Sequence, residues 1–290
     1  MAPIEIELEA WELRANRQGF NVLNRLSASL ADCGAAQIEI NCKRVSWLDS
    51  HLCSALATIC GPARARGCRV AFSNLQPNVR LVLSKIGLLS NKAVDLHRTT
   101  IPLTAFKLHD EVEFAKYSRR HLARPEMPKM TDGLRNKVFE GIDELFANSS
   151  LHSHSPFKVI ASGQFYPQKR RLALAISDGG IGIGGSLAAA GQHFRTDALA
   201  IDYAMQPDTT SRRGYIPGGL GLNVLRQFIG GNGGKLTVVS GRGFWQQDAD
   251  RVVKSELHEK FPGTAVIVEI NTGDRRSYRM QSSPSPNDVW

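Results

Sequence analysis

Three polar residues at four-residue spacing are the first candidates for chemistry in this sequence. Glu144, Asn148 and His152 lie four positions apart, so on a helix they would line one face. On such a face a carboxylate can act as a base toward water, and an amide oxygen can be a ligand of Mg²⁺. Polar residues at this spacing are also common on solvated helices, so the pattern needs support from other segments.

A second candidate begins at Asp178, where residues 178–185 read Asp-Gly-Gly-Ile-Gly-Ile-Gly-Gly. An acid at the end of a strand, followed by glycines, places a hydrogen-bond acceptor beside backbone that a flat ligand can approach closely. A flexible turn is the alternative interpretation, because glycine is frequent in turns of every kind.

A third segment combines arginines and glycines ahead of an apolar helix. Arg212 and Arg213 precede Gly218, Gly219 and Gly221. Glycines before a helix N-terminus expose N–H groups to an anion, and the arginines can add charge-assisted contacts to phosphate. The spacing is neither that of a P-loop nor that of a dinucleotide-binding glycine motif, so those two phosphate sites are excluded.

The fourth segment is Gly263-Thr264, which opens a β-branched run. Its threonine hydroxyl can reach a base or a water, although threonine is also an ordinary strand residue. Taken in order, the four segments resemble the GHKL (gyrase/histidine-kinase-like) ATPase superfamily. That family shows an ExxxN helix, then DxGxG, then a glycine-rich turn into a helix, then a late strand with Gly-Thr.

The resemblance implies ATP and Mg²⁺ as cofactors. On the adenine side, Asp178 would accept from the amino group of the base and Thr264 would join the same network. Gly180 and Gly182 would let the backbone close around the base. The implied fold is α/β, a sandwich of a mixed sheet with helices on one face and a lid near residues 186–217.

On the phosphate side, the resemblance assigns Asn148 to Mg²⁺ and Glu144 to activation or orientation of the attacking group. Gly219 and Gly221 would donate N–H groups to phosphate. The remaining members expected in the nucleotide site are His152, Arg212, Arg213 and Gly218.

Strand and helix patterns alternate through the first 92 residues, which predicts a small α/β domain with a largely parallel sheet. Leu48-Asp49-Ser50 at a helix start, with Gly67 to Pro77 after it, resembles the STAS domain of anti-sigma-factor antagonists. The resemblance makes Ser50 a possible phosphoacceptor, exposed at a helix N-terminus where a phosphate gains from the helix dipole. An ordinary helix cap is the alternative, and His51-Leu52-Cys53 departs from the family's small residues and glycine.

The domain organisation predicted from these patterns has four parts. Residues 1–92 form the STAS-like domain, 93–130 a connecting segment with one helix near 109–122, and 131–272 the ATPase domain. The tail, 273–290, has little apolar content and is expected to be disordered.

Composition restricts the class of protein. The net charge is +9, but the basic residues are dispersed, so a nucleic-acid partner is not favoured. The five cysteines have no metal-ligand spacing. The acidic N-terminus is unlike a signal peptide and no run is long enough to span a membrane, so we expect a cytoplasmic protein.

The leading hypothesis is an ATP-binding regulatory switch of the anti-sigma serine-kinase or ATPase kind, acting on its own STAS-like domain or on a protein partner. Homodimer formation is possible. The first alternative is a module that senses ATP without turnover. The second is a relative of histidine kinases, with His109 as acceptor, or a nucleic-acid-linked ATPase. His109 lacks the downstream proline and helical hairpin typical of histidine kinases.

Overall fold

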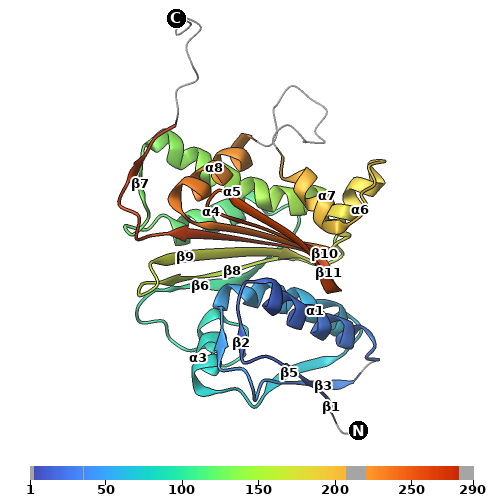
Figure 1. Ribbon diagram of the computed structural model, residues 1–290. Helices are drawn as coiled ribbons and strands as arrows, with labels where there is room; N and C mark the ends of the chain where they lie inside the picture. Colours follow the sequence, from blue (N-terminus) through green and yellow to red (C-terminus); the bar gives the residue numbers. More distant parts are fainter. Residues whose placement is uncertain (1–2, 35, 207–219, 281–290) are drawn as a thin grey trace, which may run out of the picture.

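The computed structural model describes residues 3–34, 36–206 and 220–280, and Figure 1 shows its arrangement. The N-terminal half (residues 3–92) has the predicted strand–helix alternation, and its three-stranded sheet is parallel in the order β1-β3-β5. Its elements are β1 (Ile4–Glu7), β2 (Glu12–Leu13), α1 (Arg17–Ala31), β3 (Gln37–Asn41), β4 (Trp47–Leu48), the 3₁₀ helix η1 (Ser50–Leu52), α2 (Cys53–Ala65), β5 (Arg69–Ser73) and α3 (Pro77–Ile86).

Local signals account for these helix boundaries. Asn16 caps α1 by accepting from the amide of Gly19, and Pro77 begins α3 where its missing N–H costs no helical bond. Gly87 ends α3 in the left-handed conformation, at φ 89°. The buried side of α1 carries Phe20 and the leucines predicted from the three- and four-residue spacing.

The C-terminal half (residues 93–280) is built on a five-stranded sheet in the order β10-β11-β9-β8-β6. Its elements are β6 (Thr100–Phe106), α4 (Glu111–Leu122), β7 (Lys129–Met130), α5 (Asp132–His152), β8 (Val159–Tyr166), β9 (Arg171–Asp178), α6 (Gly182–Ala189), α7 (Asp197–Ala204), α8 (Leu220–Asn232), β10 (Lys235–Asp248), β11 (Arg251–Asn271) and β12 (Ser277–Tyr278). The α/β class is confirmed.

Strand direction and extent correct the sequence analysis in three places. All neighbouring strands of the five-stranded sheet are antiparallel, where a mixed sheet was expected. The segment expected to connect two domains supplies β6, which pairs with β8. The tail expected to be disordered forms β12, which pairs with β7, and Arg276 there binds Asp274 at 2.9 Å; residues 281–290 lie outside the described ones.

Both faces of the five-stranded sheet are buried because its side chains alternate between two cores. Leu172, Leu174 and Ile176 of β9 belong to the core beneath α4, α5 and α8. Ala175 lies on the opposite face, in a core shared with the N-terminal half. Figure 1 shows α1 below the sheet and α5 and α8 above it.

Aromatic side chains join the N-terminal half to the long β10–β11 hairpin. The ring of Phe20 lies 6.4 Å from that of Phe244 and 6.2 Å from that of Phe261, in tilted and edge-on geometries. Asn24 adds a hydrogen bond, donating to the carbonyl of Glu259 at 2.7 Å. The two halves of the chain therefore share one hydrophobic core, and the helices on the second face of the sheet come from the N-terminal half.

Candidate functional site

A buried carboxylate at the end of β9 is the centre of the candidate site. Asp178 is 2% exposed. It accepts from the Ser149 hydroxyl at 2.9 Å and the Gly180 amide at 3.1 Å, and the Thr264 amide donates to it as well. Burial raises the pKa of Asp178 to about 6, and the three hydrogen bonds oppose that rise. At neutral pH this group is an ionised acceptor held mainly by neutral donors.

Two glycines permit the close contacts around Asp178. A Cβ at Gly180 would overlap the carbonyl oxygen of Ser153, at the end of α5. Gly263 has φ 125°, and a Cβ there would overlap the carbonyl oxygen of Asp178. The turn after β9 is thus in direct contact with both α5 and β11, and any residue larger than glycine would separate them.

Thr264 lies beside Asp178 in the antiparallel ladder, as its predicted part in the same network requires. Its hydroxyl is 3.1 Å from the Ser240 hydroxyl, and Ser240 accepts from the amide of Ile183 at 2.7 Å. A Cβ at Gly182 would lie 2.8 Å from the Ser240 oxygen. Thr264 and the segment that contains Asp178, Gly180 and Gly182 are more than eighty residues apart in sequence, yet they form one cluster.

Glu144 makes a contact that its sequence spacing did not predict. Its carboxylate accepts from the amides of Gly221 and Leu222, at 3.3 and 2.9 Å, and so caps the N-terminus of α8. A negative charge is favourable there because the helix dipole and unpaired N–H groups meet at that end. The Gly221 amide, assigned to phosphate by the family resemblance, donates to Glu144 in this structure.

Asn148 and His152 follow Glu144 on the same helix, as the spacing predicted. Asn148 is exposed and His152 is half-buried. No group of three or more His, Cys, Asp or Glu side chains in the described part of the chain is arranged to hold a metal ion. The exposed amide oxygen of Asn148 can serve as one ligand of a metal ion.

Four predicted members of the site lie outside the described residues. These are Arg212, Arg213, Gly218 and Gly219, all within residues 207–219. The lid predicted near residues 186–217 is described in part. Thr196 is the N-cap of helix α7, and its side chain accepts from the Leu199 amide. Asp197, the first residue of α7, accepts from the Arg242 amide at 2.8 Å.

Ser50 lies far from this cluster, and its expected exposure is wrong. Ser50 is 2% exposed, at the start of η1. Its hydroxyl is 3.3 Å from the side-chain oxygen of Gln164 and 3.2 Å from the Tyr166 hydroxyl. Both partners belong to β8, more than a hundred residues away, so tertiary packing buries a helix start that sequence alone places at the surface.

The parallel sheet and its helices agree with what comparison with known proteins finds. The sequence model of the STAS domain matches residues 20–100. A STAS domain is present in this chain. The match does not reach residues 131–272, and no curated protein matches the chain.

A STAS domain indicates a regulatory role in signalling, and such domains commonly act with regulatory partners. In this protein the STAS domain contacts the C-terminal sheet through a polar network as well as through its hydrophobic core. No described helix is long and apolar enough to cross a membrane.

The polar network between the STAS domain and the sheet has Arg171 at its centre. Arg171 donates to Asp49 at 3.2 Å and to Glu269 at 3.1 Å, which joins the STAS domain to β9 and β11. The imidazole of His51 is completely buried, with Nε2 3.8 Å from Glu269 and Nδ1 3.4 Å from the Tyr166 hydroxyl.

Titration of the network follows from burial and charge. Burial lowers the pKa of His51, against the attraction of Asp49 and Glu269. For Asp49, burial alone would raise the pKa, but His51, Arg171 and hydrogen bonds from Ala15 and Trp47 outweigh it and lower the pKa. Asp49 is therefore ionised at neutral pH, with Arg171 as its partner.

Sequence reasoning missed Ser149 and Gly141 as parts of the candidate site. Ser149 follows Asn148 directly and lies on the buried face of α5, where its hydroxyl donates to Asp178. A Cβ at Gly141 would overlap the carbonyl oxygen of Gly221, so this glycine sets the close packing of α5 on α8. A glycine inside a helical pattern was the available signal for that contact.

Proposed function

We propose that residues 131–272 bind ATP with Mg²⁺ and that the nucleotide state regulates the STAS domain or a protein partner. The observation that carries this proposal is the buried cluster of Asp178, Gly180 and Thr264, which residues 131–272 assemble from two strands and a turn. Its carboxylate can accept a hydrogen bond from an amino group of a base, and its glycines let the backbone of the turn pack closely beside that carboxylate.

The described residues fit such a nucleotide in separate ways. Asp178 and Thr264 would hold the base, and Asn148 would be a ligand of the magnesium ion. When bound, Mg-ATP supplies a phosphoryl group that water or a hydroxyl can accept. The α8 N-terminus offers N–H groups suited to an anion, and Glu144 accepts from two of them in this structure.

Calorimetric titration with Mg-ATP tests the binding site. We expect Asp178→Ala to lower the affinity by at least about tenfold, because the base loses its acceptor. Asp132→Asn is the matched control, since Asp132 is exposed in the first turn of α5 and lies outside the cluster. Equal affinities for the wild type and Asp178→Ala would refute the site.

Turnover is a separate question from binding. Glu144 is engaged by the α8 amides, which favours a sensor over an enzyme in this conformation. Glu144→Gln with single-turnover phosphate release decides between them. Loss of turnover with retained binding assigns Glu144 to catalysis, whereas bound ATP that persists in the wild type without phosphate release identifies a sensor.

The position of Ser50 argues against direct transfer within one chain. Arg171, beside Ser50, and Asp178 are the two ends of β9, about 23 Å apart at 3.3 Å per residue. Asp178 faces α5, whereas Arg171 faces the STAS domain. A kinase of this architecture would need the STAS domain to detach or an acceptor on a partner. Intact mass after incubation with Mg-ATP, followed by phosphosite mapping, tests the proposal.

The same mass measurement addresses the histidine-kinase alternative. His109 is exposed in the turn ahead of α4 and is not on a helix. A phosphate on His109 would favour that alternative despite the missing helical hairpin. For a nucleic-acid-linked ATPase, the charge predicts binding to DNA or RNA that weakens steeply with salt.

A further inference from the structure

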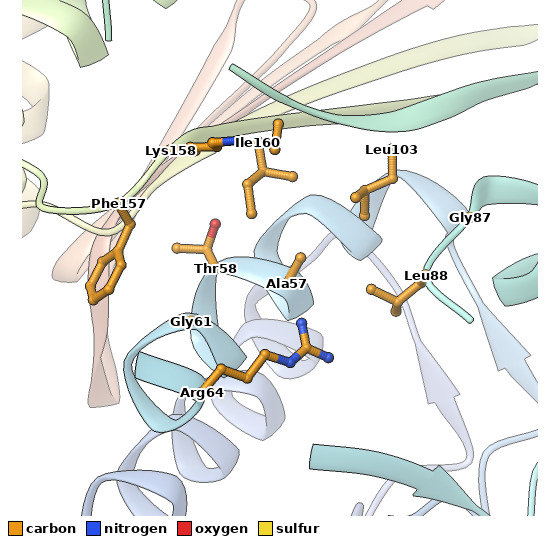
Figure 2. Close-up of a pocket in the computed structure, with 11 residues that line it drawn as sticks. Ala57, Thr58, Gly61, Arg64, Gly87, Leu88, Leu103, Phe157, Lys158 and Ile160 are labelled. Atoms are coloured by element: carbon orange, nitrogen blue, oxygen red, sulfur yellow. The ribbon is translucent and has the colours of Figure 1, made fainter. Parts of the chain in front are cut away.

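A pocket opens where the STAS domain meets the C-terminal sheet. It has a volume of about 320 Å³ and lies between α2, the segment after α3, and strands β6 and β8. Figure 2 shows side chains of both halves pointing into it, with Ala57 and Thr58 on α2 facing Ile160 and Leu103 on the strands. The volume suits a small ligand, and interfaces between domains are common places for such sites.

The lining of this pocket combines an apolar body with positive charge. Leu88, Leu103 and Ile160 give it an apolar wall, and Phe157 adds a ring. Arg64 and Lys158 are the charged residues that line it, and both are exposed. In the described part of the chain, neither side chain has an acidic partner within salt-bridge distance, so both charges are available to an anion.

A buried hydroxyl in the same wall has no partner. Thr58 is 4% exposed, and its Oγ1 makes no hydrogen bond within the described residues. A buried polar atom without a hydrogen-bond partner destabilises the fold, so a ligand whose polar group forms that hydrogen bond would gain affinity. Figure 2 shows the Thr58 oxygen pointing from α2 toward β8, the strand that carries Ile160.

We propose that this pocket binds a small organic anion with an apolar body, such as an aromatic or short-chain carboxylate or sulfonate. The apolar part would lie against Leu103 and Ile160, and the anionic group would lie between Arg64 and Lys158. Because the ligand contacts both halves of the chain, its binding stabilises the docked position of the STAS domain.

The pocket also touches the turn that follows Asp178. A Cβ at Gly179 would lie 3.1 Å from the ring of Phe157 and 3.7 Å from Cγ2 of Thr58, two residues that line the pocket. A ligand that moves either side chain would therefore shift the turn. Any effect of that shift on ATP rests on the proposed function, whereas binding of the anion does not.

Calorimetric titration of the full chain without nucleotide tests the proposal, with naphthalene-1-sulfonate as the anionic probe and naphthalene-1-methanol as its neutral counterpart. We expect saturable binding of the sulfonate at one site per chain and weaker binding of the alcohol. Absence of sulfonate binding would overturn the proposal.

Two variants locate the site. Arg64→Gln with Lys158→Gln changes exposed residues only, and we expect it to weaken sulfonate binding by about tenfold or more and to leave alcohol binding unchanged. Gly61→Leu fills the pocket from α2, where an added Cβ meets no atom within 4 Å, and should abolish binding of both probes.

The matched control is Arg80→Gln with Lys92→Gln, which removes the same charge from exposed positions that do not line the pocket. Sulfonate binding that falls equally in the control pair would show general charge attraction and overturn the site. Circular dichroism verifies that each variant is folded. Repeating the sulfonate titration on Asp178→Ala keeps the two proposals apart, because the anion should still bind when the nucleotide site is lost.

Discussion

Two buried aspartates lie near opposite ends of strand β9, and their pKa values move in opposite directions. Asp49, beside Arg171 at the start of the strand, has its pKa lowered despite burial because charged neighbours outweigh the loss of water. Asp178, at the end, receives only hydroxyl and amide donors, and its pKa rises to about 6. The opposite pKa shifts distinguish two roles. Asp49 is a carboxylate that holds the STAS domain to the sheet, whereas Asp178 is one that can accept from an additional donor.

The largest expected effect comes from removing the partner of Asp49. Arg171→Met leaves Asp49 and Glu269 buried without their cation, and we expect the free energy of unfolding to fall by about 3 kcal/mol. Urea denaturation measures this change. Arg275→Met, at an exposed position, is the control and should change stability by less than about 0.5 kcal/mol.

If the charge of Arg171 is the reason why the pKa of Asp49, unlike that of Asp178, is lowered, the loss of Arg171 should also raise the pKa of Asp49. The unfolding free energy of Arg171→Met would then gain a dependence on pH above 4 that the Asp49→Asn, Arg171→Met double variant lacks. Identical profiles of the two proteins would mean that the network does not depend on this charge.

The next effect concerns Asp178 and has a defined sign. Its pKa is raised on folding from an ordinary value near 4 to about 6, so the folded state holds a proton that the unfolded state releases between those values. The contribution of Asp178 to stability is complete below about pH 4 and is lost as the pH rises to about 6, by up to about 3 kcal/mol.

Urea unfolding of the wild type and Asp178→Asn from pH 4 to pH 7 isolates this contribution. The wild type should lose stability relative to the variant as pH rises through that window. Asp49→Asn should run parallel to the wild type over this window, because the stability contributed by the lowered pKa of Asp49 is lost only as pH falls below about 4. Parallel profiles for wild type and Asp178→Asn would contradict the raised pKa.

The smallest effect is expected at Tyr166. Its hydroxyl accepts from the Ser50 amide at 3.0 Å, so Tyr166→Phe leaves a buried amide without its acceptor. We expect a loss of about 1 kcal/mol in the free energy of unfolding. Tyr203→Phe, on α7, is the control and should leave stability within about 0.5 kcal/mol of the wild type.

The sequence predicted what depends on local periodicity and on glycine spacing. Phe20 and Leu23 identified the buried face of α1, and the glycines after Asp178 identified the turn that contacts α5 and β11. Strand β6 escaped prediction because Pro102 interrupts its pattern. Pro102 is tolerated because β6 is an edge strand, where a missing N–H need not break the ladder.

Long-range contacts account for the rest. Ser50 has the local sequence of an exposed helix start, and only the approach of Gln164 and Tyr166 buries it. Glu144 has the spacing of a catalytic residue, yet its partners are amides of α8, which no helical periodicity identifies. The helices of the STAS domain cover the second face of the sheet because the hydrophobic surfaces of the domain and the sheet fit each other. The sequence of either part alone does not show that fit.

The sheet that lies between two helical layers limits how this protein can change state. Removing α1 and α2 from it would expose Phe244, Phe261 and Ile267 to water on one continuous face. Exposed apolar surfaces of that kind adhere to other molecules. The STAS domain can therefore leave the sheet only if another molecule covers the exposed face. A binding partner would compete with the STAS domain for that face.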